Sequence, residues 1–148
     1  MVEINNLTSV EIDQNFIKEI AQTILQKEKK DGILSIAFIG PGRMRKLNKK
    51  YRGKNRVTDV LAFEEKGLEP MPWSQELRKI QGLGEVVICL REVKKNAKKF
   101  NEDFKKELAR VLIHGILHLL GYDHEKSEKE AKKMKEKEEE YLKKIIKL

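Results

Sequence analysis

The sequence predicts an α+β fold in a single domain, with a small mixed β-sheet packed against helices. Its 148 residues are the length of one domain, and 39% of them are hydrophobic, which is enough for one core. Segments with strand character cluster early in the chain and helical periodicity dominates late, a distribution typical of α+β proteins. The sequence contains no repeat and no Gly/Ser-rich or Pro-rich linker. We therefore expect residues 1–148 to form one domain.

The first half of the chain alternates strands with helices. Thr8 and Glu11 form a capping-box pattern ahead of apolar residues at helical spacing, which predicts an amphipathic helix from about Thr8 to Leu25. A Gly-Pro-Gly turn at 40–42 separates the second strand from a short basic helix that ends near Tyr51. The predicted strands are 2–4 at an edge, 33–39, 57–63 and 85–90.

A long loop is expected between the last two strands. Residues 64–84 contain Gly67, Pro70, Pro72 and Gly82, which oppose regular structure. A loop of this length in so small a domain is often functional.

The second half of the chain is predicted to be helical. One helix covers about 92–100, and a second is opened by the polar residues 101–103. The second helix is apolar on nearly all sides, so we expect it to be the buried central helix, ending at Gly121. Ser127 and Glu130 cap a last helix, whose lysines and glutamates at three- and four-residue spacing are typical of a solvated face. We assign this charge run no function.

All three histidines of the chain fall within eleven residues. His114 and His118 are four residues apart, so their rings lie one turn apart on one face of the buried helix. A left-handed Gly121 would reverse the chain and bring His124 back toward them. A single histidine on an apolar helix is usually a hydrogen-bonded core residue, but two without evident partners would carry a desolvation cost. The pattern therefore predicts a metal site.

The ligand set favours a catalytic ion. Three neutral imidazoles leave the charge of Zn²⁺ uncompensated and a fourth position open to water, which is typical of catalytic zinc. Such an ion lowers the pKa of bound water to ~7 and polarises phosphoryl or carbonyl oxygens. Ni²⁺ or another divalent ion would also fit imidazole ligands. Cys89 follows an apolar strand, which predicts a buried, inert thiol rather than a fourth ligand.

The histidine spacing is also that of the metzincin protease motif H-E-x-x-H-x-x-G-x-x-H. Those proteases carry their general-base glutamate directly after the first histidine. Gly115 occupies that position here and has no side chain to accept a proton. Peptide hydrolysis is therefore the least favoured of the metal-dependent reactions.

A basic segment at 43–56 favours a nucleic-acid partner. The chain has a net charge of +8, and this segment alone holds eight basic residues and no acidic one. A solvated basic helix is the alternative for any single lysine. Arginine suits bidentate phosphate contact better than lysine. The basic residues are Arg43, Arg45, Lys46, Lys49, Lys50, Lys54 and, as the better phosphate ligands, Arg52 and Arg56.

Two carboxylates and the cell compartment complete these expectations. Glu85 and Asp123 lie near the motifs in sequence and could orient a ligand histidine or a water.

A single cysteine indicates a reducing compartment. The sequence has neither the apolar region of a signal peptide nor a membrane-spanning run, so we expect a cytoplasmic protein without a membrane partner.

One eleven-residue segment resembles the H-G-x-L-H-L-x-G-Y-D-H signature of the YbeY family of bacterial rRNA maturation endoribonucleases. It reads His114-Gly115-Ile116-Leu117-His118-Leu119-Leu120-Gly121-Tyr122-Asp123-His124. Residues 51–54, 58–63 and 84–89 agree with the family in the same order, with Ala62 where Ser is common and Glu85 where Asp is common.

The resemblance implies a metal-dependent, single-strand-specific endoribonuclease that acts in 16S rRNA 3′-end maturation and ribosome quality control. It also implies a metalloprotease-like zinc helix, one zinc ion on His114, His118 and His124, a functional Arg52, and the ribosome or ribosomal proteins as partners. The general base stays open between metal-bound hydroxide and the ribose 2′-hydroxyl as nucleophile. A ribosome-assembly factor that binds pre-rRNA without cutting it, with a structural metal, is the alternative.

Overall fold

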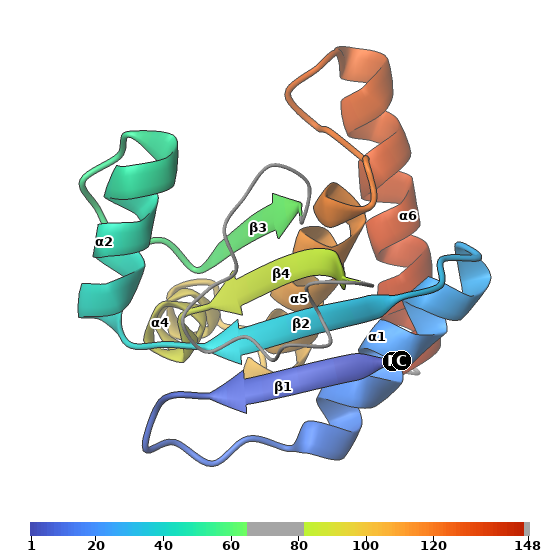
Figure 1. Cartoon of the computed structure of the whole chain (residues 1–148). Helices are drawn as coiled ribbons and strands as arrows, with labels where there is room; N and C mark the ends of the chain where they lie inside the picture. The colour runs from blue at the N-terminus through green and yellow to red at the C-terminus, as the bar shows by residue number, and fades with distance from the viewer. Residues whose placement is uncertain (65–81, 147–148) are drawn as a thin grey trace.

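The computed structural model describes residues 1–64 and 82–146, which form an α+β fold with a four-stranded mixed sheet (Figure 1). The predicted loop at 64–84 falls largely on residues 65–81, outside the described residues. In chain order the elements are β1 (Val2–Asn6), α1 (Gln14–Lys27), β2 (Ile33–Phe38), α2 (Pro41–Arg52), β3 (Val60–Glu64), β4 (Gly82–Ile88), α4 (Leu90–Lys99), α5 (Phe104–Leu119) and α6 (Glu128–Ile146).

The sheet has the strand order β1-β2-β4-β3. β1, β2 and β4 are parallel, and β3 runs antiparallel to β4 at one edge. Every residue of β2 is buried, as expected for a central strand covered on both faces. All four predicted strands are confirmed, with ends shifted by up to three residues.

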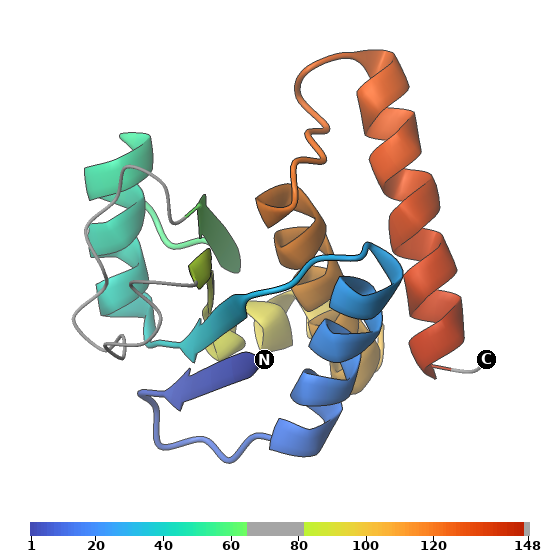
Figure 2. The ribbon, with the colours of Figure 1, turned by 45° about the vertical axis from the view of Figure 1, so that its right-hand side comes forward.

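The helices divide the core between the two faces of the sheet (Figure 2). On one face α2 packs against a small apolar cluster, which contains Met44, Leu61, Phe63, Val87 and Cys89. On the other face lies the main core, to which α1, α4, α5 and α6 contribute. The predicted central helix is confirmed, since α5 buries ten of its residues and contacts α1, α4, α6 and the sheet.

The predicted start of the first helix is wrong. α1 begins at Gln14, and its N-cap is Asp13, whose carboxylate accepts a hydrogen bond from the Phe16 amide at 3.1 Å. The Thr8 hydroxyl instead donates to Asn6 Oδ1 at 2.6 Å, in a turn that follows β1. Thr8 and Asp13 are both residue types that cap helices. Because the Thr8 side chain is hydrogen-bonded within the turn after β1, Asp13 is the residue that caps α1.

Both ends of α5 follow the predicted signals. The Asp103 carboxylate caps the N-terminus by accepting from the Lys106 amide. At the other end the Gly121 amide donates to the His118 carbonyl and the Tyr122 amide to the Leu117 carbonyl, which is a Schellman motif. Gly121 has a φ of +107°, so the predicted left-handed reversal is confirmed.

The remaining helices also follow prediction. α2 and α4 lie where the sequence places them, and the Ser127 hydroxyl caps α6 by accepting from the Glu130 amide at 3.1 Å. Among the helices of residues 1–64 and 82–146, none combines the length and the hydrophobicity needed to cross a bilayer.

Candidate active site

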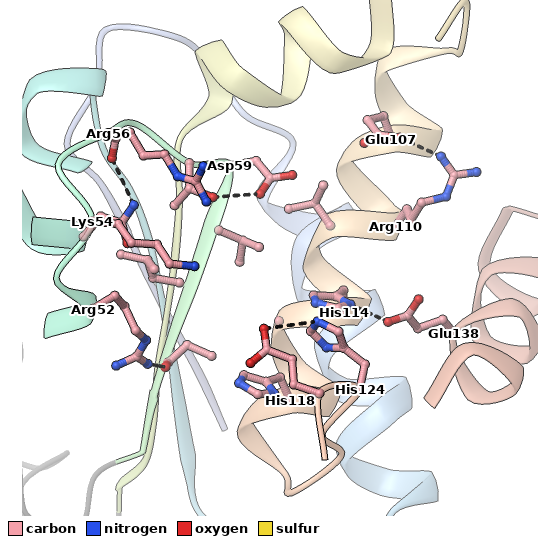
Figure 3. Close-up of a pocket in the computed structure, with 18 residues that line it drawn as sticks. Arg52, Lys54, Arg56, Asp59, Glu107, Arg110, His114, His118, His124 and Glu138 are labelled. Carbon is pink, nitrogen blue, oxygen red and sulfur yellow. Dashed lines mark hydrogen bonds and ion pairs between the residues drawn. The ribbon is translucent and has the colours of Figure 1, made fainter. Parts of the chain in front are cut away.

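A cavity of about 660 Å³ is lined by β3 on one side and by α5 and α6 on the other (Figure 3). One wall comes from the end of α2, the following turn and β3, and the other from α5, the loop after it and one residue of α6. The polar side chains that line it are Asn48, Arg52, Lys54, Arg56, Thr58, Asp59, Glu107, Arg110, His114, His118, His124, Glu125 and Glu138.

The structure brings the three predicted histidines together at this cavity. His114 and His118 extend from one face of α5, with ring planes 12° apart and ring centroids 6.5 Å apart. The reversal at Gly121 returns His124, whose centroid lies 5.2 Å from that of His114 and 6.2 Å from that of His118.

The histidines converge without forming a closed metal site. Two imidazoles on one tetrahedral zinc ion, each bound at about 2.0–2.1 Å, would place their ring centroids about 5 Å apart. His114 and His124 match that separation, whereas His118 lies roughly 1 Å too far from both. Within residues 1–64 and 82–146, no three His, Cys, Asp or Glu side chains are already arranged to hold an ion. Zinc binding would require a small shift of the His118 ring.

The hydrogen bonds of the rings select the nitrogen that remains for a metal. His114 Nδ1 lies 2.5 Å from Glu138 Oε1, and His118 Nδ1 lies 3.0 Å from the Tyr122 carbonyl oxygen. A neutral ring that donates from Nδ1 keeps its lone pair on Nε2. The donor chemistry therefore fits a metal ion held through Nε2. The bond to Glu138 raises the pKa of His114, and burial of the ring acts in the opposite direction.

The loop between His118 and His124 is anchored by a carboxylate at the end of α1. The Tyr122 hydroxyl donates to Glu28 Oε1 at 2.8 Å, and the Tyr141 hydroxyl of α6 donates to Glu28 Oε2 at 2.5 Å. Burial alone would raise the pKa of Glu28, but the two hydroxyls and the Lys137 ammonium outweigh it and lower that pKa. Glu28 thus ties the histidine loop and α6 to the same point.

Arg52 lines the cavity opposite the histidines, with its charge available. Its guanidinium donates to the Ala62 carbonyl at 2.8 Å and to the Tyr51 carbonyl at 3.2 Å, and it lies 5.0 Å above the Phe63 ring. No carboxylate of the described residues pairs with it. Arg52 and His118 also line an adjoining depression of about 230 Å³. The side chain is therefore held across the cavity from the histidines and keeps donors for an anion.

The rest of the basic segment divides between two surfaces. Lys54 and Arg56 join Arg52 on the wall of the cavity. The other five basic residues lie on α2 and do not line it, namely Arg43, Arg45, Lys46, Lys49 and Lys50. The structure thus gathers only the C-terminal part of the predicted basic segment at the site.

Gly115 lies where α5 packs most closely on the sheet. A Cβ at this position would come within 2.9 Å of Val86 Cγ1 and 3.0 Å of Val60 Cγ2. The first distance is shorter than real Cβ contacts and the second is tighter than most of them, so glycine permits the close approach of helix and sheet. A glutamate here would be directed at the two valines, which gives a second reason why the metzincin base is missing.

Gly115→Ala is expected to lower the free energy of unfolding by about 1–3 kcal/mol, because Val60 and Val86 must move to admit the methyl group. Urea denaturation of the metal-free protein measures it. Gly42→Ala is the matched control, since a Cβ at Gly42 in α2 meets nothing within 4 Å. The control should be neutral or stabilising by up to about 1 kcal/mol. Equal stability of the two variants would contradict the packing explanation.

Two of the three residues singled out beside the motifs lie away from the histidines. Cys89 is buried in the cluster under α2 and does not line the cavity, which confirms its predicted burial, and burial raises the pKa of its thiol. Glu85 is buried in β4 and does not line the cavity. Asp123 accepts from the Glu125 amide at 2.9 Å and so shapes the histidine loop.

The carboxylate that does contact a ligand candidate is Glu138, to which the sequence analysis gave no function. A signal for it exists in the sequence. Glu138 is four residues after Met134 and three before Tyr141, and both of those are buried in the core. This spacing places Glu138 on the inner face of α6.

The chain is similar to known proteins over nearly its whole length. The sequence model of the family described as Endoribonuclease YbeY matches residues 3–146. Endoribonuclease YbeY of Thermodesulfovibrio yellowstonii is 48% identical over 110 residues, which are 74% of this chain and 65% of that relative. Endoribonuclease YbeY of Petrotoga mobilis is 38% identical over 146 residues, which are 97% of this chain and 94% of that relative.

A solved structure has the same fold. The solution structure of TM1509 from Thermotoga maritima is 33% identical in sequence and superposes with a TM-score of 0.65. The match covers 98% of this chain and 89% of that one.

Proposed function

The chain belongs to the YbeY family, and on that basis we propose that it is a metal-dependent endoribonuclease that cleaves single-stranded RNA in the cavity between β3 and α5. The observation that carries the proposal is the convergence of three histidines opposite an arginine with no carboxylate partner among the described residues. Family membership further supports precursor 16S rRNA as the substrate, 3′-end maturation and ribosome quality control as its roles, and the ribosome as its partner.

The residues have distinct roles in this proposal. His114 and His118, through Nε2, and His124 would together hold one Zn²⁺, or another divalent ion that prefers imidazole. When bound, the ion supplies a Lewis acid and an acidic water. Arg52 has five N–H donors. Two of them donate to backbone carbonyls and fix the side chain, which leaves donors to bind a non-bridging phosphate oxygen. Lys54 and Arg56 attract neighbouring phosphates.

The missing glutamate at Gly115 leaves two routes for the nucleophile. Attack by water gives a 3′- or 5′-phosphate directly, whereas attack by the ribose 2′-hydroxyl gives a 2′,3′-cyclic phosphate. Analysis of the product ends distinguishes these routes. A requirement for the 2′-hydroxyl would also restrict cleavage to RNA.

The function is tested with protein of known metal content and three labelled substrates: a single-stranded RNA, the matching DNA and a peptide. We expect endonucleolytic cleavage of the RNA that stops when a chelator removes the metal. Tight RNA binding without cleavage by the metal-loaded protein would instead favour a non-catalytic assembly factor. Cleavage of the peptide alone would contradict the proposal.

The salt dependence of RNA affinity is expected to depend on the basic residues that line the cavity and not on the whole basic segment. The double variant Lys54→Gln and Arg56→Gln is expected to reduce the slope of log K against log salt by about 1.4, because each phosphate contact on a single strand contributes ~0.7. The double variant Lys46→Gln and Lys49→Gln makes the same charge change on α2, outside the cavity, and should keep the slope. Fluorescence anisotropy with metal-free protein measures both. A wild-type slope in the Lys54→Gln and Arg56→Gln variant would remove the cavity wall from RNA binding.

A further inference from the structure

The C-terminal helix reaches the histidine cluster through a single carboxylate. Glu138 Oε1 lies 2.5 Å from His114 Nδ1, and Figure 3 shows its side chain extending from α6 to the edge of the ring. The Glu138 side chain is 21% exposed, although α6 is otherwise rich in exposed charge. This contact therefore belongs to the packed face of the helix.

We propose that Glu138 is the positioning residue of the metal site. Its carboxylate accepts the Nδ1 proton of His114 and thereby holds the Nε2 lone pair toward the ion. The inference rests on the proposed function, because it assumes that the histidines bind a metal. A carboxylate behind a ligand histidine fixes the tautomer, orients the ring and increases the basicity of the ligating nitrogen.

The second histidine of α5 is held in the same way by a different acceptor. His118 Nδ1 donates to the Tyr122 carbonyl at 3.0 Å, so both rings keep Nε2 for the metal. The carbonyl is neutral, whereas Glu138 places a negative charge behind a site whose three ligands are neutral. Glu125 lies 3.8 Å from His124 Nε2, but its side chain is 80% exposed and is not held in place. Asp59 also lines the cavity but acts on His114 through its charge without a hydrogen bond, so among the described carboxylates Glu138 is the one that is hydrogen-bonded to a histidine of the cluster.

The position of Glu138 is also fixed by a second contact of α6. Tyr141, three residues later on the same face, is fully buried and donates to Glu28 Oε2 at 2.5 Å. Glu28 also accepts from Tyr122, whose carbonyl holds His118. The two histidines of α5 are therefore oriented by a connected set of groups that spans α1, the histidine loop and α6.

The geometry separates this role from direct ligation. A carboxylate bonded to Nδ1 lies across the imidazole ring from an ion bound to Nε2. Glu138 would have to break its hydrogen bond to His114 in order to bind the ion directly. The His114 ring would then lose the contact that orients it.

The test is zinc affinity, measured by competition with a chromophoric chelator. Glu138→Ala is expected to weaken zinc binding about 10- to 100-fold, the usual effect of losing such a partner. Glu138→Gln should weaken it less, because the amide oxygen still accepts from Nδ1. Glu139→Ala, at the exposed neighbouring position, removes the same charge from α6 and should bind zinc like the wild type.

Two further readouts exclude a merely structural role. In the zinc-loaded protein the His114 Nδ1 proton should give a slowly exchanging downfield NMR signal that Glu138→Ala abolishes. Thermal melts of the metal-free proteins should show that Glu138→Ala is still folded at the temperature of the zinc titration, so that its weaker zinc binding does not come from unfolding.

Several results would overturn the proposal. It is wrong if the wild type binds zinc and Glu138→Ala binds it equally well, or if Glu139→Ala weakens binding as much. It is also wrong if Gln is no better than Ala, because then the hydrogen bond does not matter. A wild-type protein that binds no zinc would overturn the proposed function together with this inference.

Discussion

Replacing His114, His118 or His124 by alanine is expected to abolish stoichiometric zinc binding and, with it, RNA cleavage. Each variant leaves only two imidazoles, and two rarely retain an ion that three hold. The absence of other histidines in the chain and the distant, buried Cys89 leave no substitute ligand of either type. Metal analysis after gel filtration should fall from about one ion per chain to nearly none.

The control for these variants is Arg110→Ala. Arg110 lines the same cavity one turn before His114 on α5, so its replacement tests whether any change on this face disturbs the metal. It should keep full zinc content. Full zinc occupancy in all three histidine variants would disprove the site. Lost zinc with normal cleavage would demote the ion to a structural role.

The elements of the fold could be predicted because each carries a local signal. The strands are short apolar runs, and α5 is apolar on nearly all sides. The start of α1 was missed because Thr8 and Asp13 can both act as caps, and the choice depends on the turn after β1. Strand order could not be read from the sequence, since it depends on contacts between distant segments.

The histidine site shows the same limit. The four-residue spacing and Gly121 predict that the three rings converge, and they do. The missed residue, Glu138, belongs to a helix with many glutamates; its spacing from Met134 and Tyr141 places it on the inner face, but its contact with His114 depends on how α6 packs on α5. The same holds for the basic segment, where the turn after α2 carries Lys54 and Arg56 to the cavity and leaves the lysines of α2 outside. Charge identifies the segment, but the fold selects its contacts.

Arg52→Ala is expected to keep its metal and lose RNA cleavage by ~10²–10³ in single-turnover rate, the effect of removing one transition-state contact. The guanidinium is held at Ala62 and Tyr51 and is not neutralised by any carboxylate of the described residues, so it presents a full charge across the cavity from the histidines. Arg45→Ala is the matched control. Arg45 is an exposed arginine of the same helix that does not line the cavity, and its replacement should leave cleavage near the wild-type rate.

Arg52→Lys distinguishes oriented phosphate binding from simple attraction. An ammonium keeps the charge but cannot bond two carbonyls and still present a planar pair of donors to a phosphate, so we expect only partial rescue. Full rescue would reduce the role of Arg52 to electrostatic attraction. The hydrogen bond to Ala62 and the contact with Phe63 also connect α2 to β3. If Arg52 served only to hold these two elements together, the expected result would be different. In that case the alanine variant would melt earlier and cleave normally at low temperature. Thermal melts, zinc content and single-turnover cleavage on the same preparations decide between these roles, and an alanine variant with wild-type turnover would remove Arg52 from the site.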